Sequence, residues 1–486
     1  MRILLSWASK NLETRHLISA LKDAGHEVPY WVGAVDKNGA GVEGMVEGMV
    51  VHSYWDARNN IPPRGIDAAE FSPPEKSLIK ELSEAESIIL TMMNKHFDWM
   101  CVDERKHLYY NMLGYWNGVF KRYRPDVVIF SLIPHAPFNY VVYALAEHFG
   151  IKTIIFDSVA EFGVPWSDRM LLCVDSWKES KPFLNTLKEN EGKYFAPSDL
   201  SDDLLAYYEL HTTGQGDPIP TGVKEDKKKY SASRLAVLKA KIIAESVRDL
   251  SIFEKIFGYI QKLFRQNIKQ EYKSVQRVPD FEKKFVYIPL HYQPECSTSP
   301  QGDIFVDQIL MIETVSASVP DGWVIYVKEH PVQWLFRGLN FFSSRYRGYY
   351  KKIAGLKNVR LVPIETNHYA LVNGSQAIAT VTGSTGFEAI LRDKPAIVFG
   401  YPWYQYCNGA FRVDGVLACQ SALTEIMNGF QVDHRKVLNY LKSFDEVSVH
   451  GLGALSDAIG EAVKRDSKES MKNIIKTILS ALKQVA

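Results

Sequence analysis

The chain has 486 residues, of which 46% are hydrophobic and 23% charged, a composition that predicts a packed protein of two or three domains and excludes disorder or a collagen-like repeat. Lysine and arginine number 57 against 56 acidic residues, so the overall charge predicts no nucleic-acid partner. The five cysteines include no C-x-x-C pair, which favours reduced thiols, and no apolar run is long enough to span a bilayer. We therefore expect a soluble, cytoplasmic protein.

The first 200 residues alternate between expected strands and helices. "MRILLSW" predicts a strand, "NLETRHLISALKDAGHEV" a helix that stops at Gly25, and "VPYWVG" a second strand. After helices over about 75–124, "PDVVIFSLI" and "IKTIIFDSV" predict strands on either side of the helix "NYVVYALAEHFG". This order is typical of a parallel sheet, and the lack of a Gly-x-Gly-x-x-Gly loop after the first strand disfavours a dinucleotide-binding domain.

Polar residues follow two of these strands. His135 lies in "LIPHAPFN", and Asp157 and Glu161 lie in "FDSVAEFG". We expect both segments to be loops at the carboxyl ends of strands, where open α/β sheets bind ligands. Any of the three side chains could act as a general base, and Asp157 could instead be a nucleophile. Each is also compatible with a cap, a turn or a solvated position.

Residues 201–280 are basic and amphipathic, and we expect a helical insertion or linker between two domains. An alternative is peripheral contact of residues 224–277 with the anionic inner membrane. Five apolar side chains beside lysines and arginines support that alternative: Phe253, Ile256, Phe257, Ile260 and Phe264.

A second α/β domain is expected at 281–440, followed by C-terminal helices at 441–486. Its strands are predicted in "KKFVYIPLH", "GWVIYVKEHP", "NVRLVPI", "QAIATVTG" and "PAIVFG". The predicted fold class is therefore α/β, with a first domain at 1–200 and a second domain of similar architecture.

The turn before one helix of the second domain, "TGSTGFEAILRDKP", is rich in small polar residues. Gly383 allows close approach of a ligand, and Ser384 and Thr385 add hydroxyls to the free amides of a helix start, which favour phosphate. Glu388, one turn further, could accept hydrogen bonds from ribose hydroxyls. The structural alternative is a capping box formed by Ser384 and Glu388.

Two further loops of this domain carry polar groups at strand ends. "VIYVKEHP" places Lys328 and His330 after a buried strand, where they could neutralise a phosphate and stabilise it as a leaving group. The loop "PLHYQPECSTSPQGD" supplies His291, Gln293, Glu295, Ser297 and Thr298. Glu295 could act in catalysis or hold a sugar hydroxyl, and the sequence leaves both roles open.

Metal-binding patterns are missing from the sequence. There is no Asp-x-Asp at a strand end and no His/Cys cluster with zinc spacing. We therefore expect a metal-independent reaction without a cofactor, in which protein cations and amides replace the ion.

The motifs resemble a known group of enzymes. The paired α/β domains, with "AGHEV" near the start and "GSTGFEAILRDKP" near the end, resemble GT-B glycosyltransferases. "YIPLHYQPECSTSP", "YVKEHP" and "VTGSTGFEAILRDKPAIVFGYPWY" resemble bacterial capsule and surface-polysaccharide biosynthesis proteins, a group similar to capsule Kdo transferases. The resemblance is specific over about 285–405. In the first domain it is limited to "PHAPFNYVVYALAEHFGIKTIIF".

The resemblance implies two Rossmann-like domains that face a central cleft, an acceptor domain first and a nucleotide-sugar domain second. As in bacterial sialyltransferases, Lys328 and His330 would contact the phosphate or cytidine of the donor, and Ser384 and Thr385 its phosphate. Glu388 would lie near the ribose. Asp393 departs from the pattern, because many relatives have glycine there.

The expected function is thus transfer of a sugar from a nucleotide donor to a bacterial surface glycan or glycolipid. A CMP-activated acidic sugar such as Kdo is the favoured donor, and a UDP-sugar is possible. Two alternatives are a non-hydride sugar-nucleotide epimerase of the same fold and a non-catalytic glycan-assembly protein.

Overall fold

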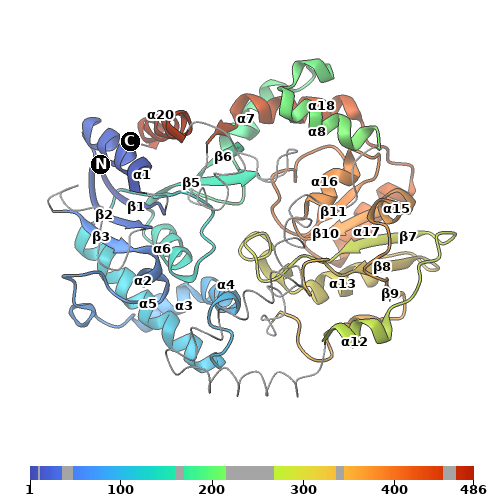
Figure 1. Ribbon diagram of the computed structural model, residues 1–486, viewed down its shortest axis with the longest axis horizontal. Helices are drawn as coiled ribbons and strands as arrows, with labels where there is room; N and C mark the ends of the chain where they lie inside the picture. The colour runs from blue at the N-terminus through green and yellow to red at the C-terminus, as the bar shows by residue number, and fades with distance from the viewer. Residues whose placement is uncertain are drawn as a thin grey trace, which may run out of the picture.

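The computed structural model describes residues 1–8, 11–34, 48–159, 169–214, 268–334, 344–451 and 467–485. Within these ranges two sheets lie beside each other, each covered by helices (Figure 1). Most of the expected basic insertion, including the apolar stripe proposed for membrane contact, lies outside the described residues, as does Glu161.

The first sheet has the strand order β13-β6-β5-β4-β1-β2-β3. Its strands are β1 (Arg2–Ser6), β2 (Glu27–Gly33), β3 (Val50–Ser53), β4 (Val127–Phe130), β5 (Lys152–Val159), β6 (Arg169–Val174) and β13 (Val449–His450). The expected parallel pairing is found from β5 through β3, and β6 and β13 add an antiparallel edge. An antiparallel neighbour fits because only residues 160–168 join β5 to β6, too few for the crossover of about a dozen residues that a parallel neighbour needs.

The second sheet is parallel throughout, in the order β12-β11-β10-β7-β8-β9. Its strands are β7 (Phe285–Pro289), β8 (Val324–Lys328), β9 (Val359–Leu361), β10 (Ala377–Thr380), β11 (Ala396–Val398) and β12 (Ala410–Arg412). In both sheets the first strand along the chain lies centrally, and the order reverses beside it, between β1 and β4 and between β7 and β10. These two strand orders confirm the expected fold class of two Rossmann-like domains.

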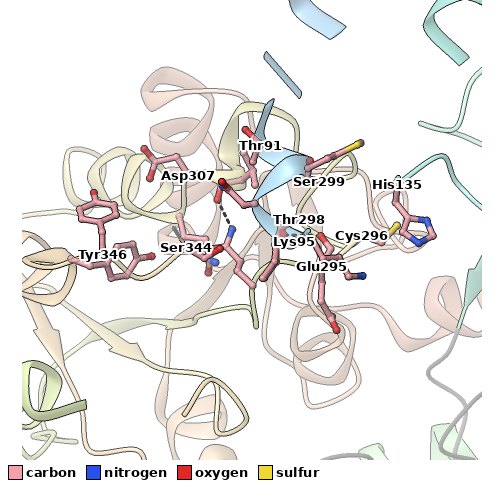
Figure 2. A pocket seen from close by; sticks show the side chains of 17 residues that line it. Thr91, Lys95, His135, Glu295, Cys296, Thr298, Ser299, Asp307, Ser344 and Tyr346 are labelled. Carbon is pink, nitrogen blue, oxygen red and sulfur yellow. Dashed lines mark hydrogen bonds between the residues drawn. The ribbon is translucent and has the colours of Figure 1, made fainter. Parts of the chain in front are cut away.

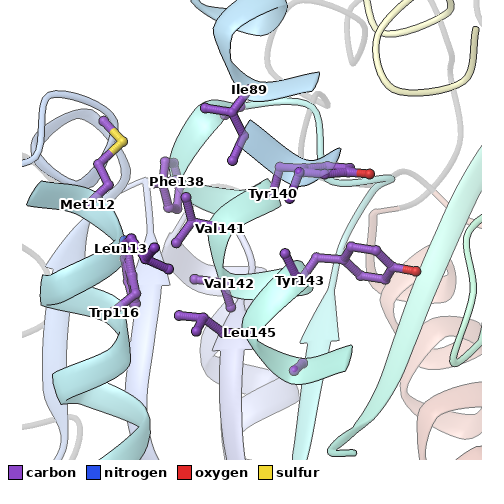
Figure 3. Packing of buried hydrophobic residues seen from close by; sticks show 14 of the residues in the cluster. Ile89, Met112, Leu113, Trp116, Phe138, Tyr140, Val141, Val142, Tyr143 and Leu145 are labelled. Carbon is purple, nitrogen blue, oxygen red and sulfur yellow. The ribbon is translucent and has the colours of Figure 1, made fainter. Parts of the chain in front are cut away.

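Helices cover both faces of the first sheet. They are α1 (Asn11–Asp23), α2 (Tyr54–Arg58), α3 (Lys76–Glu81), α4 (Ser83–Met92), α5 (Val102–Tyr123) and α6 (Pro137–His148), with short 3₁₀ turns η1 (Ala68–Glu70) and η2 (Met93–Lys95). Figure 3 shows α6 directing Val141 and Leu145 toward Leu113 and Trp116 of α5, with Ile89 of α4 above. This apolar packing fixes the loop before α6 and the turn after α4, which both carry polar side chains of the site.

Helices of the second half surround the second sheet. They are α12 (Ile268–Val275), α13 (Gln308–Ser316), α14 (Tyr349–Ala354), α15 (His368–Gly374), α16 (Ser384–Ile390), α17 (Val416–Met427) and α18 (His434–Val447), with the 3₁₀ turn η4 (Asp303–Val306). The buried side chains of α12, α13, α14, α15 and α17 belong to two clusters on the two faces of β7 and β8.

Three helices pack against a part of the chain that is distant from them in the sequence. The helices α7 (Lys181–Glu189) and α8 (Asp202–Thr212), with the 3₁₀ turn η3 (Pro197–Asp199) between them, share a core with α16 and α18 of the second half. The last helix, α20 (Ser467–Val485), returns to the first sheet and packs beside α1 (Figure 1). None of the helices that the structure describes has both the length and the hydrophobicity of a membrane span.

The return of α20 predicts that one apolar side chain near the end of the sequence stabilises the first domain. Ile478 is fully buried against the first sheet, so Ile478→Ala should lower the free energy of unfolding by about 2–5 kcal/mol. The neighbouring Lys476 is exposed, and Lys476→Ala on the same helix is the matched control. Urea unfolding of both variants measures the difference, and equal stability would show that α20 does not pack there in solution.

Candidate functional site

Three polar loops meet at the reversal point of the second sheet. They follow β7, β8 and β10, which are neighbours in the sheet, and parallel strands end at the same edge. The loop after β7 contains His291 to Thr298, the loop after β8 contains Glu329 and His330, and the turn after β10 leads into α16. The sequence therefore correctly predicted that these segments share one edge.

His291 joins the β7 loop to the turn after β10. Its Nε2 lies 3.0 Å from Thr380 Oγ1 and accepts a hydrogen bond from Thr382 N at 3.3 Å, which places the ring proton on Nδ1. Burial, aided by His330 and Arg345, lowers the pKa of His291 to about 3 and keeps it neutral. A Cβ on Gly383 would lie 2.8 Å from Thr380 Oγ1 and 3.3 Å from His291 Cε1, so this close packing requires glycine.

A buried ion pair joins the β7 and β8 loops. Arg345 Nε donates to Glu329 Oε2 at 2.7 Å, and its terminal nitrogens donate to Gln293 Oε1 at 2.7 Å and to the carbonyl of His291 at 2.9 Å. Tyr350 donates its hydroxyl hydrogen to the same carboxylate. Burial alone would lower the pKa of Arg345, but the Glu329 charge holds it above its usual value. Gln293, a predicted donor-binding residue, is thus held by this network.

His330 keeps one ring nitrogen as a donor. Its Nδ1 accepts from Val332 N at 3.2 Å, so the neutral ring carries its proton on Nε2. Burial, with the charges of Arg345, His368 and Lys328, lowers the pKa of His330 to about 4. The ammonium of Lys328 donates to the carbonyl of Thr366 in the loop after β9.

The start of α16 brings Ser384 and Glu388 together. Gly383 is the N-cap of α16 and Ser384 its first residue, so the capping-box alternative is wrong. Ser384 Oγ instead donates to Glu388 Oε1 at 3.0 Å, and His368 Nε2 lies 3.8 Å from Glu388 Oε2. Burial raises the pKa of Glu388, but His368 and Ser384 outweigh it, so the net shift is downward. Thr385, the next residue of α16, is half-buried.

A cavity of about 200 Å³ lies between the two halves of the chain, beside these loops (Figure 2). The first half contributes Lys95 and His135, and the β7 loop contributes Gln293, Glu295 and Thr298. In Figure 2, His135 and Cys296 lie at one end of the cavity and Tyr346 at the other. Ser297, also predicted for the site, accepts at its carbonyl from the Thr382 hydroxyl.

His135 presents the opposite tautomer to His330. Its Nδ1 lies 2.8 Å from the carbonyl of Ile133, which can only accept, so Nε2 keeps its lone pair. Burial and the charge of Lys95 lower the pKa of His135 to about 4. The ring that lines the cavity is therefore a neutral acceptor at physiological pH.

Asp157 lies within β5, in register with Leu171 of β6, so the expectation that it starts a loop is wrong. The strand continues through Asp157 because the antiparallel β6 pairs with it as far as Val159. Burial raises the pKa of Asp157 to about 7. Burial also raises the pKa of the cavity-lining Cys296 to about 12, with a further contribution from the Asp157 charge. Across the part of the chain that the structure describes, no group of three His, Cys, Asp or Glu side chains could hold a metal ion.

The residues of the site that sequence reasoning missed include Lys95, Glu329 and Arg345. Glu329 lies between the two predicted residues of "KEH", and Arg345 follows 16 positions later, so only the folded structure pairs them. Lys95 comes from η2 in a helical region without any motif.

Comparisons with known proteins agree with the resemblance noted above. Residues 245–409 match a family model described as capsule polysaccharide biosynthesis protein. Over 95 residues the chain is 32% identical to the capsule polysaccharide modification protein LipA of Neisseria meningitidis serogroup B, and 30% identical to that of serogroup A. Each alignment covers 20% of this chain but only 12% of LipA, so the match concerns a small part of a longer protein.

The comparison with solved structures found two Kdo transferases called KpsC from Thermosulfurimonas dismutans. The β-Kdo 2,7 transferase is 10% identical with a TM-score of 0.32, covering 74% of this chain and 88% of its own. The β-Kdo 2,4 transferase is 14% identical with a TM-score of 0.34, covering 73% and 87%. A UDP-GlcNAc 2-epimerase from Methanocaldococcus jannaschii is 13% identical with a TM-score of 0.26, covering 92% and 98%.

The Glu329–Arg345 pair predicts a large loss of stability when its charge balance is broken. Glu329→Gln leaves a buried guanidinium without its carboxylate, so the free energy of unfolding should fall by about 3–5 kcal/mol. The matched control is Glu313→Gln, which breaks an exposed pair with Lys352 at 3.7 Å and should cost less than about 1 kcal/mol. Chemical denaturation measures both, and similar losses would contradict the structural role of the buried pair.

Proposed function

We propose that the chain is a glycosyltransferase of capsule polysaccharide assembly that uses a nucleotide-activated sugar. The observation that carries this proposal is the convergence of the β7, β8 and β10 loops at the reversal point of the second sheet, within the segment that matches the capsule family model. The donor nucleotide would bind at these loops. We favour a CMP-activated acidic sugar as donor, with a UDP-sugar as the alternative.

The second half of the chain supplies groups suited to an anionic leaving group. His330 keeps an Nε2–H donor because its Nδ1 accepts from the backbone. Lys328 adds a cation at the end of β8, the strand that precedes His330, and the start of α16 adds backbone amides beside Ser384. Hydrogen bonds from such fixed groups would stabilise the charge that grows on the phosphate as its bond to the anomeric carbon breaks.

The first half supplies a group suited to the acceptor. The acceptor oxygen forms the new bond to the anomeric carbon, and its proton must leave. The His135 Nε2 lone pair lines the cavity and can take that proton. We assign the base to His135 rather than Asp157, because Asp157 belongs to β5 and does not line the cavity. Glu295 lines the same cavity and is proposed to hold a sugar hydroxyl.

Replacing His330 should impair donor use. His330→Ala removes the Nε2–H donor, so kcat/KM should fall by about 100- to 1,000-fold, while His107→Ala, at an exposed position of α5, should have no effect.

The assay incubates the unsubstituted protein and both variants with CMP-activated and UDP-activated sugars, with and without a glycan acceptor, and the products are separated chromatographically. Conversion of donor without acceptor would indicate an epimerase. No nucleotide binding by thermal shift, or full activity of His330→Ala, would refute the proposal.

The pH dependence of the reaction identifies the base. With His135 as the base, kcat/KM should rise as the pH increases through about 4, where Nε2 loses its proton, and stay level from about pH 5.5 to 8. With Asp157 as the base, the rise would instead centre near pH 7, where that carboxyl ionises. A pH–rate profile of the parent protein and of Asp157→Asn separates the two, since loss of a rise near 7 in the variant would contradict the assignment to His135.

A further inference from the structure

The cavity contains a cation that no side chain of the described residues neutralises. Lys95 ends η2, which is held in place by its own buried Met93 and by the buried Met92 and Phe97 on either side. In the ranges that the structure describes, Lys95 forms no ion pair, although it lines the cavity and is half-buried there. A partly desolvated ammonium without a carboxylate partner is costly, and an anionic ligand would offset that cost.

The preceding residue supplies a second donor. Asn94 also lines the cavity, and its Oδ1 accepts from Arg105 Nη1 at 2.6 Å. This contact assigns the carbonyl end of the amide to Arg105, so the Nδ2 hydrogens of Asn94 are left as donors. Two adjacent residues of one rigid turn thus offer an ammonium and an amide donor.

A second cation, Arg58, lies near Lys95, and the Glu295 carboxylate lines the same cavity. Burial lowers the pKa of His96 and His135, and the charge of Lys95 lowers both further, whereas it opposes the rise that burial causes in the pKa of Cys296. Arg58 approaches His96 Nε2 at 3.4 Å, and among described residues it forms no ion pair and its buried Nε has no hydrogen-bond partner. Asp307, which also lines the cavity, is the N-cap of α13. Its carboxylate accepts hydrogen bonds from Ile309 N and Leu310 N.

We propose that Lys95 and Asn94 form a subsite for the carboxylate of an acidic sugar. The inference rests on the proposed function and deepens it, because it names the substrate class that the cavity selects. A carboxylate offers two oxygens, one for the Lys95 ammonium and one for the Asn94 amide, whereas a neutral sugar leaves the ammonium unpaired. The carboxylate can come from the acceptor glycan or from the donor sugar.

Binding of two matched probes tests the subsite without any transfer reaction. The methyl ester of Kdo methyl glycoside replaces the carboxylate of the parent glycoside with a neutral, slightly larger group, so calorimetric titration of the unsubstituted protein should show about 10- to 100-fold tighter binding of the acid. Lys95→Gln should abolish that preference, Lys95→Arg should retain most of it, and Lys121→Gln, at an exposed position of α5, should leave it unchanged. Thermal melting confirms that each variant is folded.

Equal binding of acid and ester by the parent protein, or an undiminished preference in Lys95→Gln, would overturn the subsite. Repeating the titration with a saturating CMP-activated acidic sugar identifies the source of the carboxylate: unchanged binding assigns the subsite to the acceptor, and competition assigns it to the donor sugar. The two proposals also fail separately. Sugar transfer without a carboxylate preference would remove only the subsite, and a Lys95-dependent preference without nucleotide binding would remove only the transferase.

Discussion

The buried guanidinium of Arg345 fixes the shape of the site in the second half of the chain. Loops at strand ends are rich in backbone groups that need partners, and two adjacent loops would otherwise be free to move independently. Arg345 binds the Glu329 carboxylate after β8 and both the side chain of Gln293 and the carbonyl of His291 after β7. A guanidinium is suited to this position because its planar set of donors can serve several acceptors at once and it stays charged when buried. The geometry of both loops therefore depends on one side chain.

The three histidines of the site differ in role because the backbone contacts of each ring leave a different ring nitrogen or a different protonation available. His291 uses Nε2 to accept from Thr382, so its ring is turned into the protein and holds two loops together. His330 accepts at Nδ1 and is left with an Nε2–H, whereas His135 donates at Nδ1 and is left with an Nε2 lone pair. Burial lowers the pKa of all three, so none is charged near neutral pH. A donor in the second half of the chain and an acceptor in the first half suit the proposed transfer between two substrates.

Sequence patterns were sufficient for the architecture but not for the contacts. The apolar runs predicted β1, β2, β4, β5 and β7 to β11, because buried parallel strands are nearly continuous in hydrophobic residues. The strands that were missed, β3, β6, β12 and β13, lie toward the edges of the two sheets, and two of them have only two or three residues. Placing polar residues after strands also predicted correctly that the loops after β7, β8 and β10 lie at one edge of the second sheet. Sequence could not show that His291 points inward, since the loop spacing is the same for either orientation, nor that Lys95 joins the cavity from a distant helical region.

A buried charge network joins the first sheet to helices that pack with the second half of the chain. Arg169 of β6 is fully buried; its Nε donates to Asp203 of α8 at 2.7 Å, and its Nη1 pairs with Asp445 of α18 at 3.0 Å. The two carboxylates together hold the pKa of Arg169 above its usual value despite burial, and the guanidinium in turn lowers the pKa of Asp203. Because a buried charge network is costly to open, this edge resists separation. Arg169 of the first sheet thus joins two helices that pack with the second half of the chain, and one buried side chain fixes this edge of the two halves, as Arg345 fixes the loops of the second sheet.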